Sequence, residues 1–257
     1  MAALSEIVAF LDRELRTTEV PDAEPAVNGL QLANGGTVTR VAAAVDFSAQ
    51  VVARAAAVNA TLLIVHHGMM WRGRERLVGA AYQRLKQAIE ADIAVYSSHI
   101  PLDIHPRFGN NALLARELGL STDGTFGRYQ GIEIGVLGSA DLATATLVER
   151  VRSFSEKFAT HAVATGVAPE RRTRRFAIIT GSGADASTID EARERGVDTL
   201  IVGEGPHHSA VYAMEQGIAV IYGGHYATET VGVQAVGALV SERFRIPWEF
   251  VDVPTGL

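Results

Sequence analysis

Short apolar runs alternate with segments of helical length along this chain, and that alternation constrains its fold more than any other feature. Residues 38–47, 61–65 and 93–98 are runs typical of buried strands. A helical segment follows the first run, with Ser48 placed to cap it, and residues 80–92 and 110–120 are also helical in pattern. Strands that alternate with helices predict a mainly parallel sheet covered by helices.

A second series of the same kind begins near residue 128. Strand-like runs alternate with helical segments up to a long amphipathic helix at 228–244 and a short strand at 248–253. The pattern predicts an α/β protein of two units, with mainly parallel or mixed sheets covered by helices. We expect residues 1–127 and 225–257 to form a metal-binding unit and residues 128–224 a second one. The last helix and strand should return to the first unit.

Charge and cysteine content narrow the function classes. The chain has no cysteine, which excludes disulfides, thiolate zinc sites, iron–sulfur clusters and cysteine nucleophiles. Its net charge of −6 disfavours a dedicated nucleic-acid binder. The basic run 171–175 fits a solvated edge better than a phosphate-steering patch. The N-terminal segment does not resemble a signal peptide, and no run approaches the ~20 apolar residues of a membrane span. These features predict a cytoplasmic protein without a membrane partner.

Imidazoles and carboxylates stand where the apolar runs end. His66 and His67 follow one run, while His99 and His225 follow two others, each with an acid four residues later. The candidate metal-binding side chains are His66, His67, His99, Asp103, His225 and Glu229. Ligands of open α/β sheets gather at the carboxyl ends of the strands, so these groups are expected at one such edge.

The types of these side chains indicate which metals would bind. Imidazole with carboxylate suits zinc, iron, manganese, cobalt or nickel, whereas calcium prefers oxygen alone. Five or six ligands exceed the need of one open zinc site and fit two divalent ions per chain. Glu229 is a natural bridge because a carboxylate is favoured at a helix start. The competing interpretation of each isolated histidine is an ordinary polar group satisfied by hydrogen bonds.

Several motifs together resemble one known family. They are Asn28-Gly29-Leu30-Gln31, Asp46 in AVDFS, His66-His67-Gly68, SSHIPLD, NNALLARELGL and GGHYATETVGV. The chain resembles the Nif-three-like dinuclear-metal proteins, also named GTP cyclohydrolase 1 type 2 homologues, over essentially its whole length. The resemblance implies a dinuclear centre held by His66, His67, Asp103, His225 and Glu229. It also implies a toroidal homohexamer whose metal sites face an internal cavity.

The function expected from residues and resemblance together is metal-dependent hydrolysis of a small nucleotide-like or heterocyclic metabolite. His99 and Glu229 are the predicted catalytic groups, because either could move the proton of an activated water. An alternative is a metal-handling protein or ring-shaped scaffold without turnover. A third possibility is a ring that binds nucleic acid or a protein partner through its central hole, and the acidic net charge counts against nucleic acid. The segment GEGPHHS contains Glu204, His207 and His208. We favour its interpretation as a helix start with two solvated histidines over that of a loop that contacts the substrate. Ser182 and Ser209 lack a Ser-His-Asp arrangement.

Overall fold

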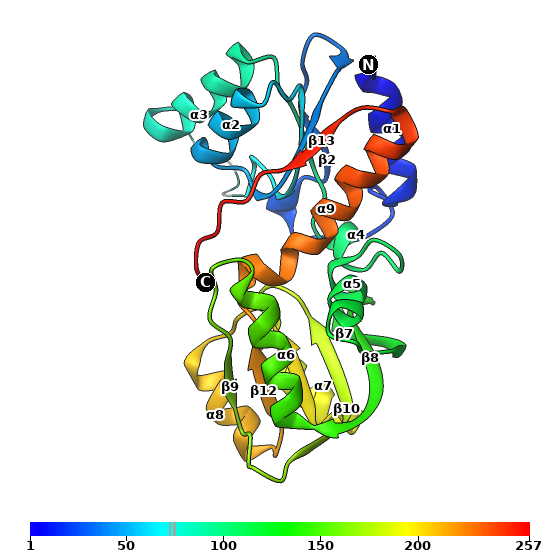
Figure 1. Cartoon of the computed structure of the whole chain (residues 1–257), viewed down its shortest axis with the longest axis vertical. Helices are drawn as coiled ribbons and strands as arrows, with labels where there is room; N and C mark the ends of the chain where they lie inside the picture. Colours follow the sequence, from blue (N-terminus) through cyan, green and yellow to red (C-terminus); the bar gives the residue numbers. More distant parts are fainter. Residues whose placement is uncertain (72, 74–75) are drawn as a thin grey trace. The chain divides into compact units, whose positions relative to one another are not determined.

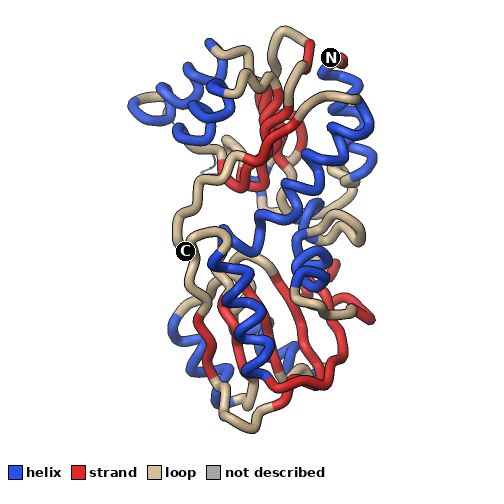
Figure 2. The backbone as a smooth tube through the Cα atoms, viewed as in Figure 1, coloured by secondary structure: helices blue, strands red, loops and turns tan. Residues whose placement is uncertain are grey.

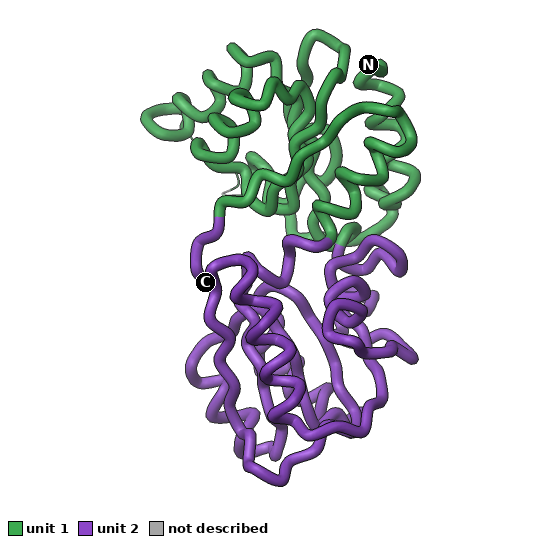
Figure 3. The backbone as a smooth tube through the Cα atoms, viewed as in Figure 1, with its two compact units in different colours: residues 1–102, 232–253 green, residues 103–231, 254–257 purple. Residues whose placement is uncertain are grey.

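The computed structural model describes residues 1–71, 73 and 76–257, which form two compact units (Figure 3). Unit 1 comprises Met1–Leu102 and Gly232–Val253, and unit 2 comprises Asp103–Val231 and Pro254–Leu257. Unit 2 therefore starts earlier than the predicted boundary at residue 128. The reason is helix α5, Asn110–Glu117, which packs Leu114 into a core of unit 2.

Unit 1 is built around one five-stranded sheet (Figure 1). Its elements in chain order are β1 Ala2–Ala3, α1 Leu4–Glu14, η1 Glu24–Ala26, β2 Gly29–Leu32, β3 Thr37–Val38, β4 Val41–Asp46, α2 Ala49–Ala57, β5 Leu62–His67, α3 Gly79–Glu90, β6 Ala94–Ser97 and β13 Trp248–Phe250. Helix α4, Ile100–Asp103, ends at the first residue of unit 2, and helix α9, His225–Phe244, begins in unit 2 and ends in unit 1. The strand order is β13-β4-β5-β6-β2.

The sheet of unit 1 is parallel except at one edge. Strands β13, β4, β5 and β6 pair in parallel, and β2 pairs antiparallel with β6. Alternate residues of the parallel strands pack beneath α2 and α3, in a core that includes Ala42, Leu63, Val65 and Val95. Ser48 caps α2 by accepting a hydrogen bond from the Val51 N–H, as its position predicted.

Strand β2 is not evident from the sequence, because two prolines and a glycine interrupt residues 20–32. The antiparallel pairing of Gly29 with Ser97 and of Leu30 with Tyr96 makes this segment an edge strand. Its register shifts between Leu30 and Leu32, a bulge of the kind common at sheet edges. The strand is only four residues long, and a glycine and a bulge interrupt the alternation that would reveal a strand in the sequence.

Unit 2 contains a six-stranded mixed sheet, whose strands are drawn red in Figure 2. Its elements besides α5 and the start of α9 are β7 Thr122–Tyr129, β8 Ile132–Ala143, α6 Thr144–Glu156, β9 Val163–Thr165, β10 Arg172–Ile179, α7 Ala186–Glu194, β11 Thr199–Val202, α8 His207–Glu215 and β12 Ala219–Tyr222. The order is β7-β8-β10-β11-β12-β9, with β10, β11 and β12 parallel.

Both faces of the unit 2 sheet are covered by helices. On β10, Phe176 and Ile178 pack with α5 and α6, while Ala177 and Ile179 pack with α7 and α8. Apolar residues on both faces explain the continuous apolar runs of these strands. The predicted α/β class, with mixed sheets covered by helices and a last helix and strand that return to the first unit, is confirmed.

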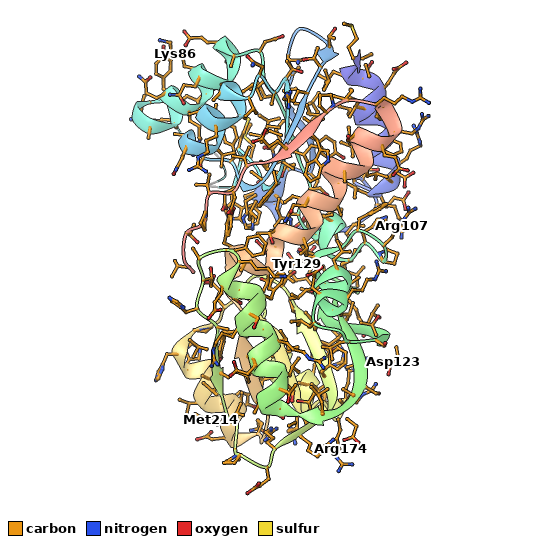
Figure 4. The ribbon with its side chains drawn as sticks, in the orientation of Figure 1. Lys86, Arg107, Asp123, Tyr129, Arg174 and Met214 are labelled. Atoms are coloured by element: carbon orange, nitrogen blue, oxygen red, sulfur yellow. The ribbon has the colours of Figure 1, made fainter. Side chains whose placement is uncertain are left out.

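The basic run 171–175 begins one residue before β10 and continues into its first four residues. Arg171 donates hydrogen bonds to the carbonyls of Asp198 and Gly217, and Arg172 pairs with Asp141 at 2.6 Å. Arg174 extends away from the ribbon (Figure 4). Within the described residues, none of the helices combines the length and the apolar character needed to cross a membrane.

Candidate metal centre

Three imidazoles of unit 1 lie together at the carboxyl end of its sheet. His66 and His67 are the last two residues of β5, and His99 follows β6. One ring nitrogen from each lies within 4.8 Å of the others, and the ring centroids of His66 and His99 are 4.8 Å apart. His66 is fully buried and His67 nearly so. Three imidazoles this close, with two of them buried, form a site suited to a transition metal.

Each of the three rings is held through Nδ1. His66 Nδ1 donates to the Ser98 carbonyl at 2.9 Å, His67 Nδ1 pairs with Asp46 Oδ1 at 2.9 Å, and His99 Nδ1 pairs with Asp22 Oδ1 at 2.8 Å. An imidazole that donates through Nδ1 presents the lone pair of Nε2. Metal-binding histidines commonly have such a carboxylate or carbonyl behind them, which fixes the tautomer and the ring orientation.

The loop before β2 supplies the carboxylate behind His99. Asp22 is a part-buried side chain that also accepts hydrogen bonds from Asn28 Nδ2 and the Ile100 N–H. Burial alone would raise the pKa of this carboxyl, but the hydrogen bond and charge of His99, with the other donors, lower it below 3.8. Asp22 is therefore ionised at neutral pH. Asn28 also accepts a hydrogen bond from the backbone N–H of His99, so its side chain contacts both Asp22 and His99.

A tryptophan side chain borders the three imidazoles. The Trp71 ring centroid lies 4.9 Å from that of His67 and 4.6 Å from that of His99. The indole remains about two-fifths exposed. Its ring therefore packs against His67 and His99 while part of it stays accessible to solvent.

Unit 2 places one imidazole among carboxylates. His225 is the first residue of α9, and its Nδ1 lies 2.8 Å from Glu204 Oε1 while its Nε2 lies 3.2 Å from Glu229 Oε2. Burial lowers the pKa of His225, but Glu229 and Glu204 outweigh that effect and raise the pKa to about 9. The hydrogen bond from His225 also lowers the pKa of Glu204. This concentration of negative charge favours a bound cation.

The turn after β10 leaves the space that Glu229 occupies. Gly181 has a φ of +66°, and a Cβ there would lie 2.2 Å from Glu229 Oε1 and 3.3 Å from His225 Nε2. This segment is a turn between strand β10 and helix α7. The turn has the further property that only glycine fits beside the carboxylate.

Asp103 lies at the end of α4, close in sequence to His99. Its Oδ1 accepts hydrogen bonds from Asn110 Nδ2 at 2.8 Å and from Thr180 Oγ1 at 3.3 Å. Two neutral donors orient the carboxylate without supplying a positive charge. A carboxylate held in this way suits a divalent cation.

The predicted metal-binding residues thus divide between the units. His66, His67 and His99 cluster in unit 1, whereas Asp103, His225 and Glu229 belong to unit 2. The sequence analysis missed Asp22, which lies in a loop without periodicity, 77 residues from its partner His99. The only indication of Asp22 in the sequence was that an acidic residue lies in a loop that contains prolines.

Other histidines have more ordinary surroundings. His105 Nδ1 accepts from the N–H groups of Arg107 and Phe108, which closes a turn. His207 and His208 are exposed at the start of α8, as the favoured interpretation predicted. His207 nevertheless lines a cavity of about 370 Å³ together with Glu204, which leaves a substrate contact open for that residue.

The chain is similar to known proteins over nearly its whole length. The model of the family Duf34/NIF3 (NGG1p interacting factor 3) matches residues 2–255. A GTP cyclohydrolase 1 type 2 homolog from Deinococcus radiodurans is 41% identical over 254 residues, covering 98% of this chain and 94% of the relative. A protein of the same name from Pyrococcus abyssi is 40% identical and covers 98% of each chain.

Solved structures show the same fold. Protein ybgI matches with a TM-score of 0.89 at 30% identity, and TTHA1606 from Thermus thermophilus matches with a TM-score of 0.85 at 32% identity. Both alignments cover all of this chain and all of the matched chain. The resemblance found from the motifs is confirmed over the whole chain.

Proposed function

This chain belongs to the Duf34/NIF3 family, and on that premise we propose that it is a cytoplasmic metal-dependent hydrolase of a small nucleotide-like or heterocyclic metabolite. In this proposal two divalent ions are held by His66, His67, Asp103, His225 and Glu229. The name shared by the relatives supports the substrate class. The chemistry of the donor groups supports the metal.

The observation that carries the proposal is the orientation of the imidazoles. In unit 1, His66, His67 and His99 have Nδ1 engaged by a carbonyl or a carboxylate, and their ligand atoms lie within 4.8 Å of one another. In unit 2, His225 is held in the same way by Glu204. Histidines that act only as ordinary polar groups would not be expected to have Nδ1 engaged in each case and their ligand atoms so close together.

The chain's own residues would hold the metals and move the proton. Bound divalent ions would supply Lewis acidity, which activates a water molecule and polarises the bond under attack. Asp22 fixes the tautomer of His99, so His99 Nε2 is oriented to accept a proton and return it to a leaving group. Glu229, which is 2% exposed, is the second candidate for proton transfer.

We also propose the homohexamer that the family resemblance implied. Light scattering should then give a mass about six times 27.4 kDa. A mass near that of a single chain would contradict the hexamer and leave the metal proposal untouched.

The test of the proposed function combines elemental analysis with an activity screen. The native protein should contain about two divalent ions per chain and should hydrolyse at least one member of a panel of nucleotides and heterocyclic metabolites. The His66→Ala/Glu229→Ala double variant should lose both properties. His208→Ala is the matched control, because this exposed histidine lies outside the candidate centre.

The outcomes separate the competing functions. Metal with no turnover of any compound would favour a metal-handling protein. No stoichiometric metal after reconstitution with zinc, iron, manganese, cobalt and nickel would refute the proposed centre. Equal loss of metal in the His208→Ala control would show that histidine removal acts through the fold.

A further inference from the structure

Unit 1 contains a cavity of about 500 Å³ with mainly apolar walls. Among the described residues, its lining includes Val27, Phe47, Met69, Ala81, Arg84 and Leu85. This volume is within the range of small-molecule sites, which are mostly apolar with a few polar groups that orient the ligand.

The walls of the cavity come from the segments that hold the histidines. Phe47 directly follows Asp46, the partner of His67 Nδ1, and Met69 follows His67 by two residues. Helix α3 supplies Ala81, Arg84 and Leu85. The cavity is therefore lined by residues that are near neighbours, in the sequence, of His67 and of its partner Asp46.

One side chain joins two walls of the cavity. Gln31 Nε2 donates to the carbonyls of Ala26 and Val27 at 3.0 and 2.8 Å, and Gln31 Oε1 accepts from the Met69 N–H at 2.6 Å. A Cβ at Gly68 would lie 2.4 Å from the Gln31 amide, so only glycine leaves room for this link. Gln31 thus fixes the loop before β2 against the turn after His67.

The backbone at the edge of the cavity is strained. Val27 has φ 41° and ψ 60°, a left-handed conformation that is unfavourable for a β-branched residue. The hydrogen bond from Gln31 to the Val27 carbonyl helps hold this conformation. Strain of this kind concentrates at ligand-binding and catalytic sites, where the surrounding structure maintains it.

Arg84 gives the cavity a preference for charge and shape. Its guanidinium carbon lies 5.1 Å from the centroid of the Phe47 ring, which is a cation–π contact. A guanidinium in this position can bind a carboxylate or phosphate through charge-assisted hydrogen bonds. Phe47 and Met69 are groups that pack well against flat rings. Glu24 also lines the cavity but is exposed.

We propose that this cavity binds a flat aromatic or heteroaromatic ring that carries an anionic oxygen group, with the anion paired to Arg84. This assignment rests on the proposed function: the cavity would hold the part of the substrate that does not react. The reacting bond would then face His67 and His99. The name that the relatives share, GTP cyclohydrolase 1 type 2 homolog, does not specify a binding site of this kind.

The test uses 2-naphthoate and its uncharged counterpart 2-naphthamide as probes for the native protein, measured by calorimetry. Naphthoate should bind about tenfold more tightly than naphthamide, the gain expected of one charge-assisted pair. Arg84→Gln should remove that difference. Lys86→Gln is the matched control, because Lys86 lies on the same helix, outside the cavity lining and largely exposed (Figure 4). 2-Naphthyl phosphate, run in parallel, tells which anion Arg84 prefers.

A second variant tests the cavity itself. Ala81→Leu places three additional carbons in the cavity and should weaken both probes. Metal content and thermal unfolding are measured for every variant. If metal is absent but naphthoate binding depends on Arg84 and Ala81, the cavity assignment stands and the proposed function fails. If metal is retained but no probe binds, or Arg84→Gln and Lys86→Gln behave alike, the cavity assignment is wrong.

Discussion

Gly68 and Gly181 each lie against a polar side chain of a proposed site, and neither position has space for a side chain. A Cβ at Gly68 would meet the Gln31 amide, and a Cβ at Gly181 would meet the Glu229 carboxylate. In both cases the obstructing atoms are the polar end of a side chain rather than backbone. A substitution at either position would therefore displace a functional group more than it would disrupt the fold.

Gly181→Ala should reduce metal content because the new methyl group displaces Glu229. Gly196→Ala is a close control, since Gly196 also has a left-handed backbone, φ +68°, but a Cβ added there would meet nothing within 4 Å. Both variants should lose about 1 kcal/mol of unfolding free energy from backbone strain. Elemental analysis and thermal unfolding check the prediction. Equal metal content in the two variants would contradict it.

Glu204→Ala should weaken metal binding roughly 10- to 100-fold, the usual effect of removing the group behind a metal-binding imidazole. The variant loses the partner of His225 Nδ1. Ser182→Ala, which removes only a donor to Glu204 at 3.0 Å, should have a much smaller effect. Competition with a metal-sensitive dye measures both affinities. Similar affinities for the native protein and Glu204→Ala would show that Glu204 does not position His225.

Much of the candidate site was predictable because its residues follow strands. Apolar runs reveal where strands end, and an acid four residues after a histidine is visible by spacing alone. The supporting groups were harder to find. Asp22 and Gln31 act through contacts that span 77 and 38 residues, and no local pattern encodes such contacts. The cavity likewise depends on helix α3 packing beside β5, which sequence spacing does not specify.

At the scale of elements, α7 shows how one side chain sets a helix start and a pH dependence. Asp185 is its N-cap and accepts from the Thr188 N–H at 2.7 Å. Burial raises the pKa of Asp185, but the hydrogen bonds from Thr188 and Ser187 outweigh that effect and lower it below 3.8. The stabilising contribution of the ionised form is present above pH 3.8 and is lost as the pH falls through the lower folded-state pKa.

Asp185→Ala should cost about 1 kcal/mol of unfolding free energy at pH 7 through loss of the cap. Asp185→Asn should keep most of the stability at pH 7, because asparagine caps helices about as well. Its stability should also fall less steeply than that of the native protein below about pH 4. Urea unfolding across this pH range measures all three proteins. Identical acid profiles for the native protein and Asp185→Asn would rule out the predicted role of Asp185 ionisation.

The elements themselves were predictable to the extent that their apolar pattern was long and regular. Runs such as 62–67 and 176–179 lie in fully covered strands, so every residue is apolar or buried. Strand β2 was missed because it is short and bulged at an edge. The boundary between the units was displaced because α5 joins the core of unit 2, and its apolar face is compatible with either unit.

At the scale of the whole molecule, the proposed ligands come from both units, each of which has its own hydrophobic core. Removal of metal by a chelator should therefore lower the unfolding temperature of both units. A ligand present at about 100 times its dissociation constant stabilises a protein by about 2.7 kcal/mol. Calorimetry before and after chelation, followed by return of the metal, measures the effect. An unchanged thermogram would argue against metal held by the folded protein.

The position of β13 in the sheet has a consequence for synthesis on the ribosome. Strand β4 consists of buried residues and pairs on one side with β13, which is made some two hundred residues later. At about 5–20 residues per second, translation leaves this apolar edge unpaired for roughly 10–40 seconds. An unpaired apolar strand at the edge of a sheet can pair with a strand of another chain, which leads to aggregation. Because β13 completes the sheet last, we expect the emerging chain to be prone to such association until its final strand is available.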